Sequence, residues 1–226
     1  MKYPVNFEIE LIKNPHKGLY LALEGIDGSG KSTQAQELKK YFEAKGKKVL
    51  LTHEPRRDGV VGPLIHEVLI GNVKVPEVTI QYLLVAGRVA HLEEMVIPAL
   101  ERGEVVISDR CFWSSIPYGM LDRFDSSEAT GDRLLSALSI LSMYHQFITP
   151  DICVYLDVDV STAAGRIKKL KRKAEIYEKE QKLIKVKNGY EFLLKKFPKE
   201  LIPVHAERHI DEVTGEIVDL IMQVKK

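Results

Sequence analysis

Short runs of β-branched and aliphatic residues alternate along the chain with longer segments that repeat apolar residues every three to four positions. Five of the short runs are apolar almost throughout and are bounded by Gly, Pro or charged residues. They are too short for helices, and this pattern is typical of buried strands. The five predicted strands cover Leu19–Leu23, Lys48–Thr52, Glu104–Ser108, Ile152–Asp157 and Ile202–Ala206.

The segments between these runs have helical periodicity and cover Lys31–Lys45, Gly62–Ile70, Glu77–Arg102, Glu128–Phe147, Ser161–Lys173, Tyr177–Phe197 and Gly215–Val224. Strands that alternate with helices indicate an α/β fold in which helices cover both faces of a parallel sheet. We therefore predict one domain over residues 1–226, built on a five-stranded parallel sheet. Ligands of such sheets bind beyond the carboxyl ends of the strands, so the residues that follow each strand are the first candidates for a site.

Residues 1–17 precede the first buried strand and form an N-terminal extension. Within it, the segment FEIELI alternates apolar and polar residues. This alternation predicts an edge strand or one arm of a hairpin, with no evident chemical role.

The first buried strand is followed by EGIDGSGKST, which contains the pattern G-x-x-x-x-G-K-[ST]. A strand before this pattern and a helix after it are the context in which it forms a phosphate-binding loop. Backbone N–H groups of the loop and the N-terminus of the helix then face phosphate oxygens. We expect ATP to contact Gly25, Ile26, Asp27, Gly28, Ser29, Gly30, Lys31, Ser32 and Thr33.

Three residues of this region carry specific expectations. Lys31 is expected to reach the β and γ phosphates, and the hydroxyl of Ser32 is expected to bind Mg²⁺. Asp109 ends the run VVISD at the carboxyl end of the third strand, where an acid of the Walker-B type holds the metal. Its structural alternative is to cap the following turn. The predicted metal site is therefore Ser32 with Asp109.

Composition excludes several classes of protein. The 33 Lys and Arg against 32 Asp and Glu give a net charge of +1, which argues against a surface built to bind nucleic acid or an anionic membrane. Cys111 and Cys153 lie far apart, so we expect no disulfide framework, no cysteine zinc site and a cytoplasmic location. No stretch approaches the ~20 apolar residues of a membrane span. The absence of N-K-x-D and the short chain disfavour a switch GTPase and a helicase.

The segments LEGIDGSGKSTQ, HEP, VIPALERG, VVISDR, SS-x-x-Y and PDICVYLDVDV occur in the order found in thymidylate kinases, which the chain resembles from about Leu19 to its last helix. That family has a P-loop kinase fold, transfers the γ phosphate of ATP to dTMP with Mg²⁺ in dTTP synthesis, and usually works as a homodimer. The resemblance therefore implies ATP and dTMP as partners, Mg²⁺ as cofactor and a second copy of the chain as partner.

Phosphoryl transfer between two polyanions requires several cations to converge on one point. By the resemblance, Arg110 contacts the acceptor phosphate and Arg88 reads the edge of the base. Asp27 contacts the sugar hydroxyl, Glu54 lies near the metal and the acceptor phosphate, and Tyr118 packs against the sugar and favours deoxyribose. The alternatives are weak surface ion pairs for the arginines and simple core packing for Tyr118.

The segment Arg166–Lys173, RIKKLKRK, carries six basic and no acidic residues. Such a run is either a solvated helix face or a basic helical lid, over about residues 161–180, that closes on ATP. Some thymidylate kinases carry a catalytic arginine in the phosphate loop, where this chain has Ser29, and others carry it in the lid. The chain resembles the second kind, so Arg166, or else Arg172, is expected to be catalytic with Lys31, Arg110 and Glu54.

The chain also departs from the family pattern in the acceptor pocket. Leu84 stands where a Phe usually stacks on thymine, and Gly119 where a Gln is common. His53 replaces the Arg before Glu-Pro, and Arg56 or Arg57 is a candidate to replace its charge. A broader pyrimidine monophosphate kinase and a non-catalytic nucleotide-binding protein therefore stay open as alternatives.

Two apolar stripes remain. The stripe within Glu77–Arg102 is consistent with a subunit interface or with a fully buried helix. The stripe beyond the lid is interpreted as core rather than as a binding site; it consists of Ile176, Leu183, Val186, Tyr190, Leu193 and Phe197.

Overall fold

The computed structural model describes residues 8–123, 137–169 and 176–224, and every statement below concerns these residues. Five parallel strands form the central sheet in the order β3-β4-β2-β6-β7. This confirms the predicted sheet, and every boundary lies within one residue of the prediction. The strands are β2 (Leu19–Glu24), β3 (Val49–His53), β4 (Val105–Asp109), β6 (Ile152–Asp157) and β7 (Ile202–His205).

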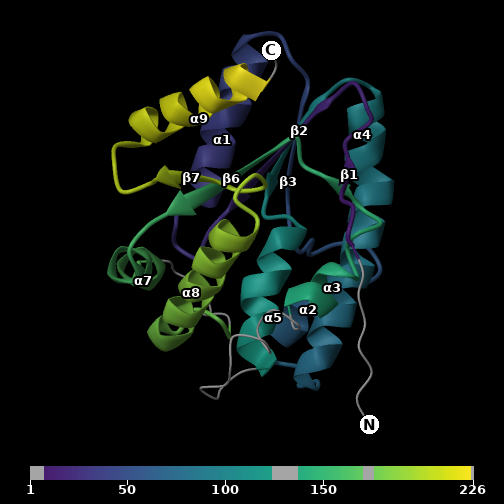
Figure 1. The fold of residues 1–226 in the computed structure, drawn as a ribbon, viewed down its shortest axis with the longest axis vertical. Helices are drawn as coiled ribbons and strands as arrows, with labels where there is room; N and C mark the ends of the chain where they lie inside the picture. The colour runs from purple at the N-terminus through teal and green to yellow at the C-terminus, as the bar shows by residue number, and fades with distance from the viewer. Residues whose placement is uncertain (1–7, 124–136, 170–175, 225–226) are drawn as a thin grey trace.

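Helices cover both faces of this sheet, as predicted. Helices α1 (Lys31–Ala44) and α9 (Ile210–Val224) lie side by side on one side, and α4 (Ile97–Glu101) packs on the other (Figure 1). Helices α5 (Ser115–Arg123) and α8 (Glu180–Lys196) pack against each other below the sheet in the same view. Because helices cover both faces of the sheet, β2 is buried along its whole length, and its sequence is apolar except for the last residue, Glu24.

The long helical segment predicted over Glu77–Arg102 is helical but not uniform. It consists of α3 (Glu77–His91), a π-helical turn over Leu92–Val96, and α4. Within that turn the N–H of Ile97 bonds to the carbonyl of Leu92, five residues back. The next residue, Pro98, has no N–H to donate and its ring crowds the preceding turn, so a wider turn accommodates it.

Several helix predictions need correction, and one of them concerns α8, which begins at Glu180 rather than at the predicted Tyr177. The sequence pattern predicts no helix over residues 115–123, but they form α5, after a short 3-10 turn at Phe112–Ser114. The described part of the helix predicted over Glu128–Phe147 covers residues 137–141 and ends there. Helix α9 begins five residues before the predicted Gly215, because Asp211 and Glu212 in its first turn favour the positive end of the helix dipole.

The remaining helices are α2 (Gly62–Leu69) and α7 (Val160–Lys168), the latter at the start of the predicted lid. Strand β1 (Ile12–Lys13) pairs in parallel with β5 (Ile148–Thr149) in a separate two-stranded sheet. Of the described part of FEIELI, only Ile12 lies in a strand. The hairpin interpretation is wrong, since β1 pairs with a strand distant in the sequence. No helix of the described residues is long and apolar enough to cross a membrane.

Candidate active site

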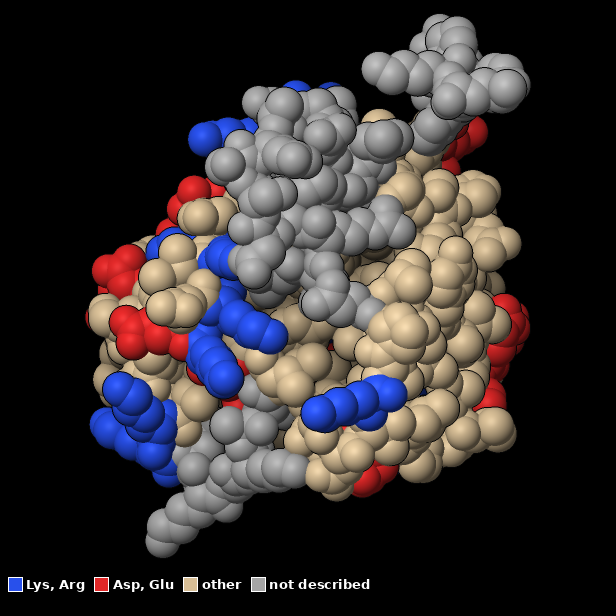
Figure 2. Space-filling view, turned by 90° about the horizontal axis from the view of Figure 1, so that it is seen from below, with Lys and Arg blue, Asp and Glu red and all other residues tan. Residues whose placement is uncertain are grey.

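A cleft of about 810 Å³ opens where the phosphate loop meets the ends of β3 and β4 and the start of α7. Seen from below, Lys and Arg side chains gather on one half of the molecular face, and the other half carries few charged residues (Figure 2). Most of the predicted site residues line the cleft, namely Asp27, Gly28, Gly30, Lys31, Ser32, Thr33, Glu54, Asp109, Arg110 and Arg166.

Glycine is required at Gly28 of the phosphate loop. Its φ is 82°, a left-handed conformation that L side chains rarely adopt. A Cβ atom there would lie 2.4 Å from the backbone carbonyl oxygen of Ala163 in α7. The loop can therefore approach α7 only with glycine at this position, and this close approach brings the start of the predicted lid to the phosphate loop.

The ammonium group of Lys31 is buried and turned back onto the loop. Its Nζ donates to the carbonyl oxygens of Gly25, at 3.1 Å, and Ile26, at 2.9 Å. Burial, with a further contribution from the nearby Arg110, lowers the pKa of Lys31 to about 8. A cation that is desolvated in this way gains strongly from a polyanion placed beside it.

Ser32 and Asp109 meet as predicted for a metal site. The hydroxyl of Ser32 donates to Oδ2 of Asp109 at 2.5 Å, which joins the first turn of α1 to the end of β4. The described residues contain no group of three or more His, Cys, Asp or Glu side chains that could hold a metal. Mg²⁺ in nucleotide sites takes only one or two protein oxygens and completes its shell with phosphates and water. A hydroxyl and a carboxylate in contact are a donor set that fits it.

Arg110 connects the phosphate loop to α5. Its Nη2 donates to Oδ1 of Asp27 at 2.5 Å and to the hydroxyl of Tyr118 at 2.8 Å, and the Tyr118 hydroxyl donates to Asp27 in turn. Burial alone raises the pKa of Asp27, but the positive charges of Arg110 and Lys31 outweigh burial and lower it. Asp27 is therefore an anion held between cations.

The backbone of Arg110 is also unusual, with a φ of 77°. This left-handed conformation is uncommon for a residue other than glycine and costs on the order of 1 kcal/mol or more. Its N–H donates to the carbonyl of Leu23, and its carbonyl accepts a hydrogen bond from the hydroxyl of Ser108. Both backbone polar groups of Arg110 are therefore hydrogen-bonded. The fold thus fixes the direction in which this arginine leaves β4.

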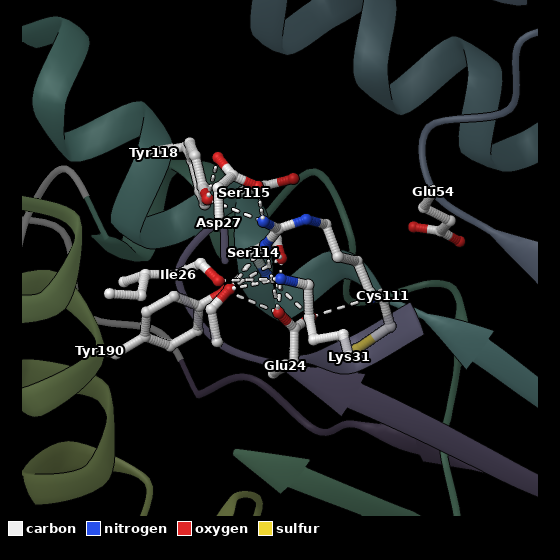
Figure 3. Close-up of polar contacts among 12 residues, drawn as sticks. Glu24, Ile26, Asp27, Lys31, Glu54, Cys111, Ser114, Ser115, Tyr118 and Tyr190 are labelled. Carbon is white, nitrogen blue, oxygen red and sulfur yellow. Dashed lines mark hydrogen bonds and ion pairs between the residues drawn. The ribbon is translucent and has the colours of Figure 1, made fainter. Parts of the chain in front are cut away.

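Glu24, Ser114 and Tyr190 also lie beside Arg110, although none of them is among the predicted site residues. Glu24 is fully buried, and its carboxylate accepts the N–H groups of Cys111 and Ser114 and the hydroxyls of Ser114 and Tyr190. In Figure 3 Tyr190 reaches from α8 toward Glu24, with Lys31 and Ser114 close by. Glu24 falls within the segment that the strand-end rule selects, whereas Tyr190 has only an apolar pattern around it, which predicts core.

Glu54 forms a second buried cluster, set apart from the first in Figure 3. One carboxylate oxygen accepts from Nε of Arg88, and Nδ1 of His91 lies 3.0 Å from the other. The far ring nitrogen of His91 lies 2.8 Å from the hydroxyl of Thr52. Burial raises the pKa of Glu54, but Arg88 and His91 together lower it. His91 was missed by the sequence analysis, although it lies one helical turn after Arg88 on α3.

The acceptor-pocket predictions are brought together only in part. Arg88 and Tyr118 are buried side chains that do not line the cleft, and Leu84 is half-buried on α3. The guanidinium of Arg88 lies 4.8 Å from the centre of the Tyr144 ring and donates to the hydroxyl of Ser115. Arg56, a candidate to replace the charge missing at His53, is paired with two acidic side chains, Asp58 and Glu94.

In the lid region, Arg166 points from α7 into the phosphate loop. Its Nη1 donates to the carbonyl oxygens of Gly28, at 3.3 Å, and Ser29, at 3.2 Å, and its Nη2 donates to Ala206. This position beside the loop is the one expected of a lid arginine. The second candidate, Arg172, lies outside the described residues.

Comparison with known proteins shows the family of the chain. A family model described as thymidylate kinase matches residues 23–217. The chain belongs to the thymidylate kinase family. A probable thymidylate kinase of Thermococcus gammatolerans is 34% identical to it over 214 residues, which are 91% of this chain and 97% of that protein. The thymidylate kinase of Nitrosospira multiformis is 32% identical over 206 residues, which are 89% and 95% of the two chains.

A solved structure agrees as well. The thymidylate kinase of Candida albicans superposes with a TM-score of 0.77 at 27% identity and covers 94% of each chain. The P-loop kinase fold and the family resemblance expected from the sequence are therefore confirmed. The family and these relatives confirm the predicted function, so the chain is an ATP-dependent nucleoside monophosphate kinase that acts on dTMP. The roles of individual residues stay predictions.

Proposed function

We propose that the chain transfers the γ phosphate of ATP to dTMP and releases dTDP and ADP, with the residue roles given below. The observation that supports these roles best is the position of Arg110. One nitrogen of its guanidinium, Nη2, donates both to Asp27 of the phosphate loop and to the hydroxyl of Tyr118 on α5. In this proposal Arg110 lies between the triphosphate, bound at the phosphate loop, and the monophosphate, bound on the side of α5.

In this proposal each cation has a distinct place. Lys31 and the loop N–H groups bind the β and γ phosphates, and Arg110 binds the phosphate of the acceptor. Arg166, already in contact with Gly28 and Ser29, binds the group in transfer from the lid side. Phosphoryl transfer needs little covalent chemistry from the protein, because positioning and charge stabilisation provide most of the rate enhancement.

The proposal includes Mg²⁺ as cofactor, held by Ser32 and Asp109. When bound, the ion would offset the negative charge of the phosphates. The supporting observation is the direct contact between the two side chains at the end of β4.

Asp27 and Tyr118 are proposed to select the sugar. The Asp27 carboxylate can accept a hydrogen bond from a sugar hydroxyl. The Tyr118 ring is buried beside it and stacks edge-on against Tyr177, so the ring has little room to move away from an extra 2′-hydroxyl. A deoxyribose monophosphate is therefore the favoured acceptor.

The base pocket favours a second candidate function, a kinase of several pyrimidine monophosphates. Leu84 stands on the same face of α3 as Arg88, one turn away, and an aliphatic side chain packs on a base without the geometry of ring stacking. The thymidylate kinase of Candida albicans is described as having broad substrate specificity. Both observations concern the base, so phosphoryl transfer from ATP is common to the two candidates.

A panel of acceptors tests the proposal. Purified protein with ATP and Mg²⁺ is given dTMP, dUMP or UMP in turn, and ADP release is followed. We expect the highest kcat/KM with dTMP, a lower value with dUMP, which lacks the 5-methyl group, and the lowest with UMP. Comparable values for dTMP and dUMP would favour the broader kinase. Tight ATP binding without turnover on any acceptor would favour a non-catalytic role.

We also propose a homodimer that forms through α3. Val78, Tyr82 and Val89 recur along one side of this helix and are 45%, 64% and 40% exposed. Apolar side chains gathered on one helix face are typical of a contact with another protein. Light scattering of Tyr82→Lys against the wild type tests this: we expect a dimer for the wild type and a monomer for the variant, and a monomeric wild type would contradict it.

A further inference from the structure

Tyr190 is the feature of the site that the family resemblance leaves without a role. It lies on α8, beyond the predicted lid, and is completely buried. Its ring packs against Tyr155 with ring centres 4.9 Å apart. Its hydroxyl donates to Oε2 of Glu24 at 2.6 Å and lies 3.0 Å from Oγ of Ser114. The side chain is therefore apolar in its ring and polar at its tip, which ends inside the site (Figure 3).

The same hydroxyl also contacts Arg110. Nη1 of Arg110 donates to the Tyr190 oxygen at 3.3 Å, to Oγ of Ser114 at 3.0 Å and to the carbonyl of Gly25 at 3.0 Å. The other terminal nitrogen, Nη2, is held by Asp27 and Tyr118. A guanidinium is planar and rigid, so partners on both terminal nitrogens fix the orientation of the whole group.

Glu24 supplies the reason why the hydroxyl matters. Its Oε2 lies 4.0 Å from Nη1 of Arg110, too far for a hydrogen bond, and it receives the hydroxyl hydrogens of Tyr190 and Ser114 instead. A buried carboxylate that loses a donor takes another, because an unsatisfied charge in the interior is costly. The nearest strong donor is Arg110.

We propose that Tyr190 is a positioning residue for Arg110. Its hydroxyl donates a hydrogen bond to the carboxylate of Glu24 and so keeps that carboxylate from forming a direct ion pair with Arg110. The guanidinium of Arg110 then stays directed at the acceptor phosphate. The proposal rests on the proposed function in one respect, since it takes the ligand of Arg110 to be the acceptor phosphate. It also links α8 to the phosphate loop, so the helix that follows the basic segment contributes to the catalytic geometry.

The test compares Tyr190→Phe with Tyr155→Phe. Both changes remove one hydroxyl and keep a ring at the same packed pair. Of these two hydroxyls, both in described residues, only that of Tyr190 is hydrogen-bonded to Glu24 and Arg110. The Tyr155 hydroxyl, on β6, is bonded to neither. For Tyr190→Phe we expect kcat with the monophosphate to fall about tenfold, which corresponds to about 1.4 kcal/mol, with the KM for ATP unchanged. For Tyr155→Phe we expect a change below about twofold. Circular dichroism and the unfolding midpoint confirm that both variants are folded at the assay temperature.

A second measurement separates positioning from a general loss of structure. Tyr190→Phe is combined with Arg110→Lys, because lysine lacks the planar group that the hydroxyl orients. If Tyr190 acts through Arg110, removal of the hydroxyl costs less than about twofold in the Arg110→Lys background. The same tenfold loss in that background, or equal rates for the two tyrosine variants, would overturn the proposal.

Activity of the wild type with different monophosphates tests the proposed function separately from the role of Tyr190. If the wild type phosphorylates another monophosphate and not dTMP, the proposed substrate is wrong. The tyrosine comparison is then carried out with the acceptor that works, and the same two outcomes decide the role of Tyr190.

Discussion

Nδ1 of His91 lies 3.0 Å from Oε1 of Glu54, and both side chains are buried. The second oxygen of Glu54 is bound by Arg88, so the carboxylate joins two side chains that leave α3 one helical turn apart. The acid of the HEP segment is thus fixed to the helix that carries the predicted base-reading arginine. Its charge is matched within the protein, and its main effect on the acceptor is expected to pass through the orientation of Arg88.

Replacement of Glu54 by Gln should destabilise the fold, because it leaves the buried guanidinium of Arg88 without its counter-ion. Removal of one partner of a buried pair costs about 3–5 kcal/mol. Urea unfolding of Glu54→Gln against the wild type measures this difference. Glu43→Gln is the control and should change the stability little, since the one ion pair of Glu43 with another described residue is an exposed pair with Lys39.

The same carboxylate predicts a dependence of stability on pH. The pKa of Glu54 in the folded protein lies below the ordinary value of 4.5, because Arg88 and His91 outweigh burial. A lowered pKa adds stability above the unfolded value, and this stability is lost as the pH falls below it. The free energy of unfolding of the wild type should therefore decrease more steeply from pH 4.5 downward than that of Glu54→Gln. Parallel curves for the two proteins would contradict the assignment.

Because the pKa of Lys31 is lowered, we expect the protein to take up protons when ATP binds. The pKa of about 8 means that the free protein holds only part of a proton there near that pH. A triphosphate beside the amine favours the charged form, so binding should take up a fraction of one proton per ATP at about pH 8. Calorimetry in buffers of different ionisation enthalpy measures this uptake. Lys31→Arg, which stays protonated, should lack it, and an equal uptake in that variant would assign the proton elsewhere.

We expect the base of the acceptor to pack against Leu84 on α3. Leu84→Phe restores an aromatic platform on α3, and stacking on a base contributes about 1–3 kcal/mol. We expect the KM for dTMP to fall about fivefold or more while the KM for ATP stays constant. Leu84→Met keeps the side-chain volume and serves as the control, with little change expected. If Leu84→Phe leaves every acceptor unaffected, the base does not lie where we place it.

The position of Arg166 beside the phosphate loop leads us to expect that this residue raises the rate of phosphoryl transfer. An arginine that stabilises charge in phosphoryl transfer raises the rate by about a thousandfold or more. Arg166→Ala should lower kcat to that extent, whereas Lys168→Ala, an exposed neighbour on α7, should stay within about threefold of the wild type. Single-turnover kinetics measure both. Equal losses in the two variants would indicate a general effect of positive charge rather than a specific contact.

The parts of the site that the sequence predicted are those with a local signal. Lys31 and Ser32 belong to a loop pattern, and Asp109 ends a buried strand, so a position along the chain is enough to bring these residues together at one sheet edge. The parallel sheet follows from the same alternation of strands and helices. Local patterns therefore account for the part of the cleft that the phosphate loop, α1 and β4 form.

The parts that were missed depend on tertiary contacts. The hydrogen bond between Tyr190 and Glu24 joins residues 166 positions apart, and the apolar repeat around Tyr190 has the same form whether its hydroxyl faces water or a carboxylate. Helix α5 was missed because Pro117 and Gly119 weaken the helical pattern, although packing against α8 stabilises the helix. Neither a long-range hydrogen bond nor tertiary stabilisation of a weak helix leaves a periodic trace in the sequence.

The central claim is that cations around the phosphate loop bring ATP and dTMP together end to end. Incubation of the protein with ATP labelled at the γ phosphate, Mg²⁺ and dTMP, with separation of the products, tests it most directly. We predict that the label moves into dTDP, and that Arg110→Lys slows this transfer much more than it weakens ATP binding. Label that is recovered only as free phosphate, with dTMP unchanged, would contradict the account.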